Sequence, residues 1–367
     1  MAEPFKNIYN QRFFDGFTDV LRRVIPDFDS SAFLKEIYDD EWDNRELKQR
    51  MRHISTVLKN YLPDNYNQAV DKILELINHL KENQCTLALE YMFLPDFIEQ
   101  YGLQNYKVSV NAFEKITQFT SCEFAVRPFI IEYPNKMMKQ MLAWSKHENH
   151  DVRRFSTEGC RPRLPWAMAL PLLKENPSSV LPVLENLKND DSAYVRKSVA
   201  NNLNDIAKDN PEVVISLIKK WQGKTENTDW VIKHGSRTLL KQGEPEVMKV
   251  FGFGSTKNID IDEFEIISPV VKIGGVLEFT FQLSNNNNKD TKLRLEYGLY
   301  YQKANGTLSK KVYKISEKLY ENNSITLINR KQSFKLITTR KFHEGLHQVS
   351  IIVNGNEFEK NNFELVK

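Results

Sequence analysis

The stretch DVRRFSTEGCRPRLPW, residues 151–166, holds the residue types best suited to chemistry in this chain. It carries four arginines, one glutamate and one tryptophan within sixteen positions. Arginines at this density repel one another unless anions lie among them, and the planar guanidinium can bind a phosphate through two hydrogen bonds. The stretch therefore indicates either a solvated helix surface with local salt bridges or a face that binds a row of phosphates.

Two carboxylates could act at such a face. Glu158 follows Arg154 by four residues, and Glu123 precedes Arg127 by four residues. Each spacing fits a plain ion pair on one helix, which stabilises a helix by about 0.2–0.5 kcal/mol. A carboxylate among arginines could instead stay ionised and stabilise a positively charged ligand. The residues alone leave both interpretations open.

Trp166 follows two prolines in the segment RPRLPW, residues 161–166. Such a turn is stiff and could hold the indole ring in an exposed position, where it could stack on a base or a cationic purine. The ring could equally pack at the start of the next helix.

No other segment carries a strong chemical signal. The cysteines at 85, 122 and 160 are odd in number and lie far apart, which indicates a reducing cytoplasm. The segment HENH, residues 147–150, precedes a helix and favours a capping and loop role over metal binding. We expect no metal and no organic cofactor.

These candidate residues need helices to position them. Apolar residues recur at helical spacing in residues 31–42, 45–62 and 71–81, and Asp43 and Asn44 are residue types that could cap the second of these helices. After residue 257 the pattern changes to short alternating runs bounded by Asn and Gly, which is typical of a β-sandwich. The glycines of residues 251–258 indicate the linker, residues 285–288 a loop between strands, and residues 273–276 a hairpin turn.

Internal repeats connect the helices to the arginines. Val152, Val195 and Val231 each stand second in a similar motif, DVRR, YVRK and WVIK, at steps of 43 and 36 residues. Repeats of roughly 40–47 residues are typical of stacked helix pairs, whose concave face is lined by one helix per repeat. We therefore expect a mainly α fold, an α-solenoid of HEAT-like helical repeats at 1–256, followed by a small all-β immunoglobulin-like sandwich at 257–367.

The repeat register also sorts the residues within each helix. Val195, Val199, Leu203 and Ile206 form the expected buried stripe of the second repeat, and Cys160 falls on Leu203 as a core residue. Equivalent positions on the other face are Arg154, Lys197 and Lys233 in one row, and Glu158, Asn201 and Arg237 in another. In the first row a basic residue thus recurs in three successive helices. In the second row Glu158 stands where the other two repeats have Asn201 and Arg237.

Net charge is unevenly distributed along the chain. Residues 258–367 contain 16 Lys and Arg against 13 Asp and Glu, which leaves 35 of each in the first 257 residues. Nucleic-acid binding by the helical part would therefore need a one-sided arrangement of charge. The sandwich could extend a DNA grip through SKKVYK (309–314) and NRKQSFK (329–335), or could serve only as a stabilising appendage.

The chain resembles AlkC-type DNA alkylation repair proteins, which are grouped with the AlkD-type enzymes among the helical-repeat DNA glycosylases. The resemblance rests on PFKNIYNQRFFDGFTDVL, ELKQRMRHISTVLKNYLP, CEFAVRPFI, DVRRFSTEGCRPRLPWA, YVRKSVANNLNDIAKDNPEVV and SRTLLKQGEPEVM, which together span most of residues 1 to 250. The β-rich tail looks like the immunoglobulin-like extension of one branch of the family. One departure is KHGSRTL in the last repeat, where the family is associated with Arg-His-Ala.

The resemblance implies a DNA glycosylase that excises N3-methylated bases, 3-methyladenine and 3-methylcytosine, from bent DNA held on a concave surface. It also implies recognition without rotation of the base into a deep pocket. Family active-site residues map onto Glu123, Glu158 and Trp166, with Asp205 as a further matched acid. The carboxylates would stabilise an oxocarbenium-like sugar and position a water. The expected DNA-binding residues are Arg127, Arg153, Arg154, Arg161, Arg163, Arg196, Lys197, Asn201, His234 and Arg237.

The expected partner is double-stranded DNA with alkylated bases. We expect no membrane contact, a monomer, and a bacterial cytoplasmic location at the nucleoid. The competing function is a helical-repeat protein that binds DNA structures without catalysis. A pure protein scaffold, the third alternative, would not need basic residues at equivalent repeat positions.

Overall fold

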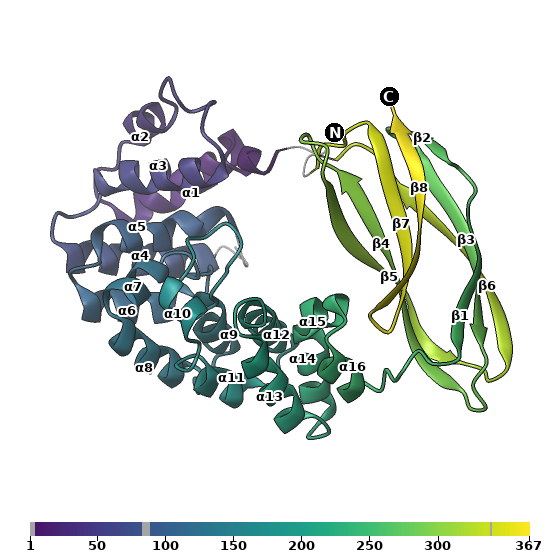
Figure 1. Ribbon diagram of the computed structural model, residues 1–367. Helices are drawn as coiled ribbons and strands as arrows, with labels where there is room; N and C mark the ends of the chain where they lie inside the picture. Colours follow the sequence, from purple (N-terminus) through teal and green to yellow (C-terminus); the bar gives the residue numbers. More distant parts are fainter. Residues whose placement is uncertain (1–3, 83–88, 338–339) are drawn as a thin grey trace. The chain divides into compact units, whose positions relative to one another are not determined.

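The structure, a computed structural model, describes residues 4–82, 89–337 and 340–367 (Figure 1). Cys85 lies outside these residues. The chain divides into two compact units, Met1–Pro211 with Gly223–Gly235, and Glu212–Gln222 with Ser236–Lys367. None of the helices in the described residues is long and apolar enough to cross a lipid bilayer.

The first unit is a stack of helices (Figure 1). Its elements are the 3-10 helices η1 (Phe5–Ile8) and η2 (Leu89–Met92) and the α-helices α1 (Gln11–Val24), α2 (Ser30–Ile37), α3 (Leu47–Lys59), α4 (Tyr66–Glu82), α5 (Phe93–Tyr101), α6 (Tyr106–Ile116), α7 (Arg127–Glu132), α8 (Pro134–Trp144), α9 (His150–Gly159), α10 (Pro171–Glu175), α11 (Leu181–Leu187), α12 (Ala193–Ile206) and α14 (Glu226–Gly235). Each helix packs on near neighbours, α3 on α5, α8 on α9, and α12 on both α9 and α14. The predicted α-solenoid is confirmed.

The three helices predicted from periodicity correspond to α2, α3 and α4. The predicted caps of α3, Asp43 and Asn44, are wrong. Residues 40–44 form a turn, so the helix begins later, and Glu46 and Gln49 form a reciprocal capping box at its start.

The repeat register is confirmed by both packing and hydrogen bonding. Val152, Val195 and Val231 are fully buried in α9, α12 and α14. Arg153 Nη1 donates to the carbonyls of residues 147 and 148, at 3.0 and 2.7 Å. Arg196 Nη1 donates to the carbonyls of residues 190 and 191, at 2.6 and 2.9 Å. The same side-chain contact therefore recurs 43 residues on and fixes the loop before each helix.

The second unit joins three helices to a two-sheet sandwich. Its helices are α13 (Pro211–Trp221), α15 (Arg237–Gln242) and α16 (Pro245–Val250). Its strands are β1 (Ile259–Ile266), β2 (Val270–Lys272), β3 (Val276–Asn285), β4 (Thr291–Gln302), β5 (Leu308–Tyr320), β6 (Ser324–Ser333), β7 (Gly345–Val353) and β8 (Asn356–Val366). The sheets have the strand orders β1-β3-β6 and β2-β8-β7-β4-β5.

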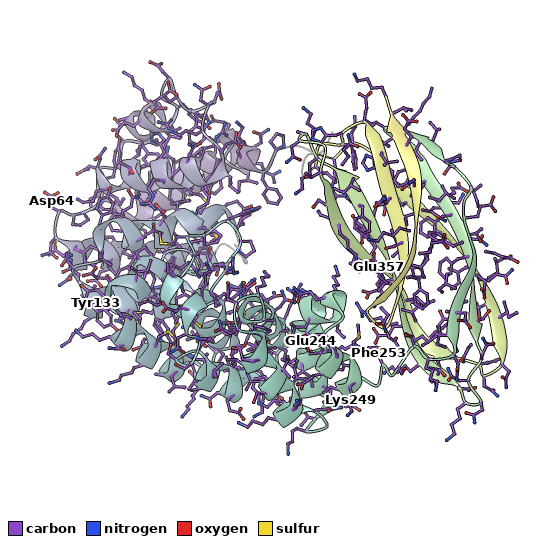
Figure 2. The ribbon with its side chains drawn as sticks, in the orientation of Figure 1. Asp64, Tyr133, Glu244, Lys249, Phe253 and Glu357 are labelled. Carbon is purple, nitrogen blue, oxygen red and sulfur yellow. The ribbon has the colours of Figure 1, made fainter. Side chains whose placement is uncertain are left out.

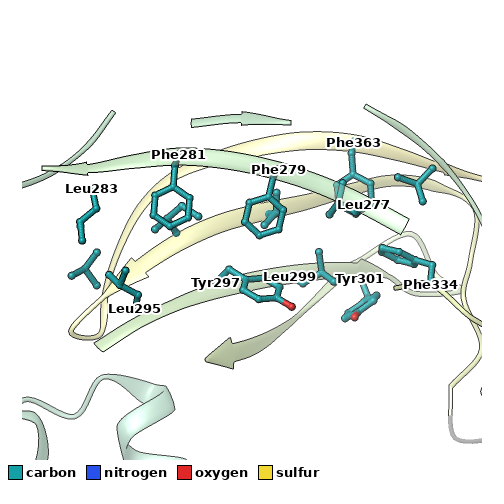
Figure 3. Packing of buried hydrophobic residues seen from close by; sticks show 14 of the residues in the cluster. Leu277, Phe279, Phe281, Leu283, Leu295, Tyr297, Leu299, Tyr301, Phe334 and Phe363 are labelled. Carbon is teal, nitrogen blue, oxygen red and sulfur yellow. The ribbon is translucent and has the colours of Figure 1, made fainter. Parts of the chain in front are cut away.

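Alternation along the strands fills the sandwich core (Figure 3). Phe279 and Phe281 of β3 are fully buried, and Tyr297 of β4 meets Phe279 edge to face at 5.3 Å between ring centroids. The predicted hairpin at residues 273–276 is wrong, because β2 pairs in parallel with β8 and β3 belongs to the other sheet. The turn there crosses between sheets.

The predicted linker, residues 251–258, connects α16 to β1 and is held against the sandwich. Phe253 is buried at the end of α16 (Figure 2), and Lys292 Nζ donates to the Phe251 carbonyl at 3.0 Å. Asn354 Nδ2 donates to the Gly254 carbonyl at 3.1 Å. Helices α15 and α16 belong to the second unit together with the sandwich. The division of the chain into domains at 1–256 and 257–367 stays a prediction.

Candidate active site and nucleic-acid interface

Glu158 lies in the last turn of α9 and is held at both carboxylate oxygens. Arg161 Nη1 donates to Oε1 at 2.6 Å, and Ser198 Oγ of α12 donates to Oε2 at 2.5 Å. Only 5% of the residue is exposed. The next residue, Gly159, lets the end of α9 pack closely on the start of α7, since a Cβ there would lie 2.9 Å from Val126. The carboxylate is therefore oriented before any ligand arrives.

Glu123 lies in the turn between α6 and α7 and faces Arg154 of α9. Ser121 Oγ donates to Glu123 Oε2 at 2.7 Å, and Arg154 Nη1 donates to the same oxygen. Arg154 Nη1 also donates to Ser121 Oγ at 2.8 Å, while Nη2 lies 3.6 Å from Glu158 Oε1. The Arg154 guanidinium thus lies between the two candidate catalytic carboxylates.

Asp205 joins the same cluster through Arg161. Arg161 Nε donates to Asp205 Oδ2 at 2.8 Å, and Lys208 Nζ donates to Oδ1 at 3.1 Å. Asp205 is buried, which places it behind Arg161 and away from solvent. Among the predicted residues, the fold therefore brings Glu123, Arg154, Glu158, Arg161 and Asp205 into one continuous charged network.

Arg127 does not form the ion pair suggested by its spacing from Glu123. It is fully buried, and its guanidinium donates to the backbone carbonyls of Met168, Gly159 and Arg161 at 2.7, 3.1 and 2.9 Å. Burial lowers its pKa to about 10. A buried side chain cannot reach a DNA phosphate in this arrangement, so the predicted DNA contact of Arg127 is replaced by a role in holding the loop after α9.

Three further predicted DNA contacts are also bound by groups of the protein. Arg153 Nε and Nη2 bind Asp190 at 2.6 and 3.1 Å, in addition to the loop carbonyls given above. Arg196 is held by its own loop carbonyls. Arg163 pairs with Asp209 at the surface, which lowers the pKa of that carboxyl through the hydrogen bond. Of these three, Arg163 is the most exposed side chain, with a relative exposure of 38%.

Trp166 stands in an exposed turn. The residue is 66% exposed, its backbone has a positive φ of 63°, and its carbonyl accepts a hydrogen bond from Lys48 Nζ at 2.8 Å. The alternative in which the ring packs at the next helix is therefore wrong. A left-handed backbone at a non-glycine residue is strained, and such strain is found at functional sites.

The remaining predicted contacts are spread over three helices. Lys197 is exposed and Asn201 half-buried on α12, and the His234 ring of α14 stacks on Trp230 at 5.0 Å. Arg237 begins α15 in the second unit.

A cleft of about 500 Å³ opens beside this network. It is lined by Glu123, Arg154, Tyr194, Asp151, His150, Ser121, Phe119, Thr120, Leu89 and Met92. The Tyr194 ring lies 4.9 Å from Arg154 Cζ, and burial raises the pKa of the tyrosine hydroxyl. The cleft offers the Glu123 carboxylate and the Tyr194 ring to a positively charged group. Glu158 is not part of its lining and lies 3.6 Å from Arg154 Nη2.

Sequence reasoning missed three residues of this site, Ser121, Tyr194 and Ser198. Tyr194 could have been found, because it precedes Val195 as Trp230 precedes Val231. Ser198 carried no signal, since the equivalent positions in the other repeats hold Phe155 and His234.

Metal ligands do not cluster in the described chain. No group of three or more His, Cys, Asp or Glu side chains there is placed to hold a metal ion. In HENH, Asn149 caps α9 by accepting from the Asp151 N–H at 2.7 Å, and His147 accepts from the Asn149 N–H at 2.9 Å. The predicted capping role is confirmed.

Comparison with known proteins matches both parts of the chain. Residues 45–239 match the family described as DNA alkylation repair enzyme, and residues 260–367 match the C-terminal Ig-like domain of the uncharacterised protein YhaZ, which confirms the immunoglobulin-like prediction. The uncharacterized protein YhaZ of Bacillus subtilis strain 168 is 40% identical over 360 residues, which cover 98% of this chain and 99% of YhaZ. The alkylpurine DNA glycosylase AlkC of Pseudomonas fluorescens, solved bound to DNA containing an abasic site analogue, is 33% identical with a TM-score of 0.93 and full coverage of both chains.

Proposed function

Because the chain belongs to the DNA alkylation repair enzyme family, in the branch with a C-terminal Ig-like domain, we propose that it is a DNA glycosylase. Its substrate is double-stranded DNA with cationic N3-methylated bases, 3-methyladenine and 3-methylcytosine. The observation that carries the proposal is the pair of oriented carboxylates, Glu158 and Glu123, in a chain that aligns over its whole length with an alkylpurine glycosylase.

The chemistry of the lesion explains why carboxylates suffice. Methylation at N3 makes the base cationic, so the base is already an activated leaving group and needs no strong general acid. Breaking the N-glycosidic bond leaves an oxocarbenium-like sugar, which a water then attacks. Carboxylates perform the same stabilisation in glycoside hydrolases. Neutral bases gain little from an acidic site, which provides selectivity.

Each residue of the site has a place in this scheme. Glu158 and Glu123 stabilise the positive charge and position or deprotonate the water. Ser198 and Ser121 orient them, and Arg161 holds Glu158 relative to Asp205. Trp166 presents its exposed ring to the lesion or its deoxyribose. The scheme uses no metal and no organic cofactor.

DNA binding would fall to the basic residues that keep access to solvent. Lys197 is exposed and Arg163 is partly exposed, while Arg154 borders the cleft. We propose that bent DNA lies on the concave face of the repeats and that the damaged base is recognised without rotation into a deep pocket. We also propose that the protein acts as a monomer in the bacterial cytoplasm. Asn201, His234 and Arg237 complete the proposed contacts.

The test is base release from methylated DNA, measured by chromatography. Wild type should release 3-methyladenine and 3-methylcytosine, and Glu158→Gln and Glu123→Gln should each lower the single-turnover rate at least about a hundredfold. Asp64→Asn, which changes a fully exposed carboxylate, is the matched control with unchanged release. Unchanged release in both glutamate variants would overturn the carboxylate assignment.

The same assay separates the competing function. A protein that only binds DNA structures would retain tight binding to DNA and release no base from any substrate. Residual binding in the Glu158→Gln variant, measured by fluorescence anisotropy, shows whether the loss concerns chemistry or affinity.

A further inference from the structure

The guanidinium of Arg154 occupies the space between the two carboxylates proposed to stabilise the lesion. Its Nη1 binds Glu123, and its Nη2 lies 3.6 Å from Glu158. A cationic base or sugar needs the negative field of the same two groups. Arg154 and the lesion therefore compete for one electrostatic position.

The formal charge of the buried network shows what this competition means. Glu123, Glu158 and Asp205 provide three negative charges, against two positive charges from the buried Arg154 and Arg161. Lys208, whose side chain is 40% exposed, pairs with Asp205 and brings the sum to zero. A network that sums to zero attracts a cationic base little more than a neutral one. Opposite charges at contact distance interact strongly where water is partly excluded, so withdrawal of one arginine changes the local field strongly.

The hold on Arg154 is incomplete. Its Nε is buried and has no hydrogen-bond partner among the described residues, and its Nη2 is too far from Glu158 for a hydrogen bond. One face of the guanidinium rests on the Tyr194 ring, and the side chain borders the cleft of about 500 Å³. A buried donor without a partner is costly, so an alternative position that satisfies it is favoured.

We propose that Arg154 is a specificity-determining residue, an internal counter-cation that leaves Glu123 and Glu158 for a DNA phosphate when a cationic lesion reaches them. The inference rests on the proposed glycosylase function. A neutral base cannot replace the lost ion pair, so Arg154 stays and the site remains neutral. A cationic lesion supplies the positive charge that Arg154 gave to the two carboxylates. The guanidinium can then bind a phosphate through two hydrogen bonds.

Two simpler roles make different predictions for removal of the charge. If Arg154 only contacts a phosphate, the loss weakens binding to all DNA equally. If Arg154 only holds the carboxylates in place, the loss weakens binding to cationic DNA most. If Arg154 is the exchanging counter-cation, the loss leaves the carboxylates unneutralised and strengthens the preference for cationic DNA.

The experiment compares two duplexes that differ in one charge. One carries a pyrrolidine abasic-site analogue, which is protonated at neutral pH, and the other carries the neutral tetrahydrofuran analogue. Fluorescence anisotropy gives both Kd values for wild type, Arg154→Met and Lys197→Met. Lys197 is the matched control, because it holds the position equivalent to Arg154 in the next repeat and its side chain has no hydrogen bond or ion pair in the described chain.

We expect Arg154→Met to raise the ratio of the neutral to the cationic Kd at least about tenfold over wild type. Lys197→Met should raise both Kd values and leave the ratio unchanged. An unchanged or lowered ratio in Arg154→Met would overturn the proposal. If wild type binds neither duplex, the glycosylase proposal fails instead, and the two failures are thereby distinguished.

A measurement on wild type alone covers the case in which Arg154→Met does not fold. Transfer of Arg154 to a phosphate adds one phosphate contact in the cationic complex. The slope of log K against log salt should then be steeper by about 0.9 for the pyrrolidine duplex than for the tetrahydrofuran duplex. Equal slopes would contradict the exchange.

Discussion

Carboxylates from four different segments surround the arginines of residues 151–163. Asp190 binds Arg153, Asp209 binds Arg163, and Glu158 and Asp205 share Arg161. Glu123 binds Arg154. The high density of arginine is thus compensated within the protein, and phosphates are not needed to hold these side chains together. DNA would compete for those arginines that remain near solvent.

The buried carboxyl of Asp96 gives a test of pH dependence. Asp96 lies on α5 with its side chain 13% exposed, 3.0 Å from Arg52. Burial raises its pKa to about 6, more than Arg52 lowers it. The unfolded chain loses this proton near pH 4 and the folded chain near pH 6, so the contribution of Asp96 to stability falls as pH rises through this window and is constant above it.

We therefore predict that the stability of the Asp96→Asn variant increases relative to that of wild type as pH rises. The difference in free energy of unfolding between variant and wild type should move by about 3 kcal/mol in favour of the variant from pH 4 to pH 7. Chemical denaturation at four pH values measures it. A difference that is the same at pH 4 and pH 7 would show that Asp96 ionises normally in the fold.

The exposed turn at Trp166 lets function be separated from stability. Glycine tolerates the φ of 63° without strain, so Trp166→Gly should leave the free energy of unfolding unchanged or raise it by up to about 1 kcal/mol. The ring is lost, and base release should fall at least about tenfold. Trp166→Phe keeps an aromatic ring and should retain part of the activity. A large loss of stability in Trp166→Gly would mean that the ring packs on the fold.

At the scale of elements, the repeat produces the same contact between an arginine and the preceding loop twice. Arg153 and Arg196 each bind the two carbonyls of the loop that enters their helix. These contacts fix the start of α9 and α12, the two helices that carry Glu158 and Ser198. Equivalent basic residues in a helical repeat can therefore serve the scaffold, and only some of them face a ligand.

Arg127 performs the corresponding task at the other end of α9. It connects α7 to the carbonyls of Gly159, Arg161 and Met168, on both sides of Arg163 and Trp166. We predict that Arg127→Met lowers the free energy of unfolding by at least about 3 kcal/mol, because three carbonyls lose their donor. Base release should fall as well, since the loop that carries Trp166 loses its anchor.

Arg163→Met is the matched control for Arg127. It removes an arginine from the same loop, but its ion pair with Asp209 lies near solvent and should contribute about 1 kcal/mol or less. Thermal or chemical unfolding compares the two. Equal losses of stability would contradict the anchoring role of Arg127.

At the scale of the whole molecule, the second unit carries a basic surface of its own. A cleft of about 700 Å³ is lined by Lys241 of α15, Lys310 and Lys311 of β5, and Arg340, with Thr238, Gln242, Val312 and Tyr313. The lysines of β5 belong to SKKVYK, one of the two segments through which the sandwich could extend a DNA grip. Lys310 Nζ pairs with Glu357 Oε2 at 3.0 Å, and in the other segment, NRKQSFK, Lys331 is bound to Glu278 at 2.6 Å.

We predict that the first segment contributes to DNA affinity. Lys310→Gln with Lys311→Gln should weaken DNA binding and reduce the salt slope by about 1.8, which corresponds to two phosphate contacts. Lys331→Gln with Lys335→Gln should change the slope less. Titration by anisotropy at several salt concentrations measures both. Equal slopes in wild type and both variants would favour the sandwich as a stabilising appendage.

The amino-acid sequence by itself determined the features that depend on local spacing. Periodicity located α2, α3 and α4 and the change from helices to strands near residue 257, and the repeat step of 43 residues placed Val152, Val195 and Cys160 in the core. The motifs around Glu123, Glu158 and Trp166 carried the family resemblance, and the family is confirmed. These inferences succeed because burial and helical register follow from residues close together in the chain.

Only the tertiary structure decided which partner each charged side chain binds. Spacing suggested Glu123 with Arg127, yet Glu123 binds Arg154, 31 residues away, and Arg127 lies buried among carbonyls 32 to 41 residues away. Ser198 reaches Glu158 from 40 residues away. Arginine and glutamate are long and flexible, so helical spacing shows which face they occupy but not the neighbouring helix they contact. The position of Arg154 between the two carboxylates arises from that packing alone.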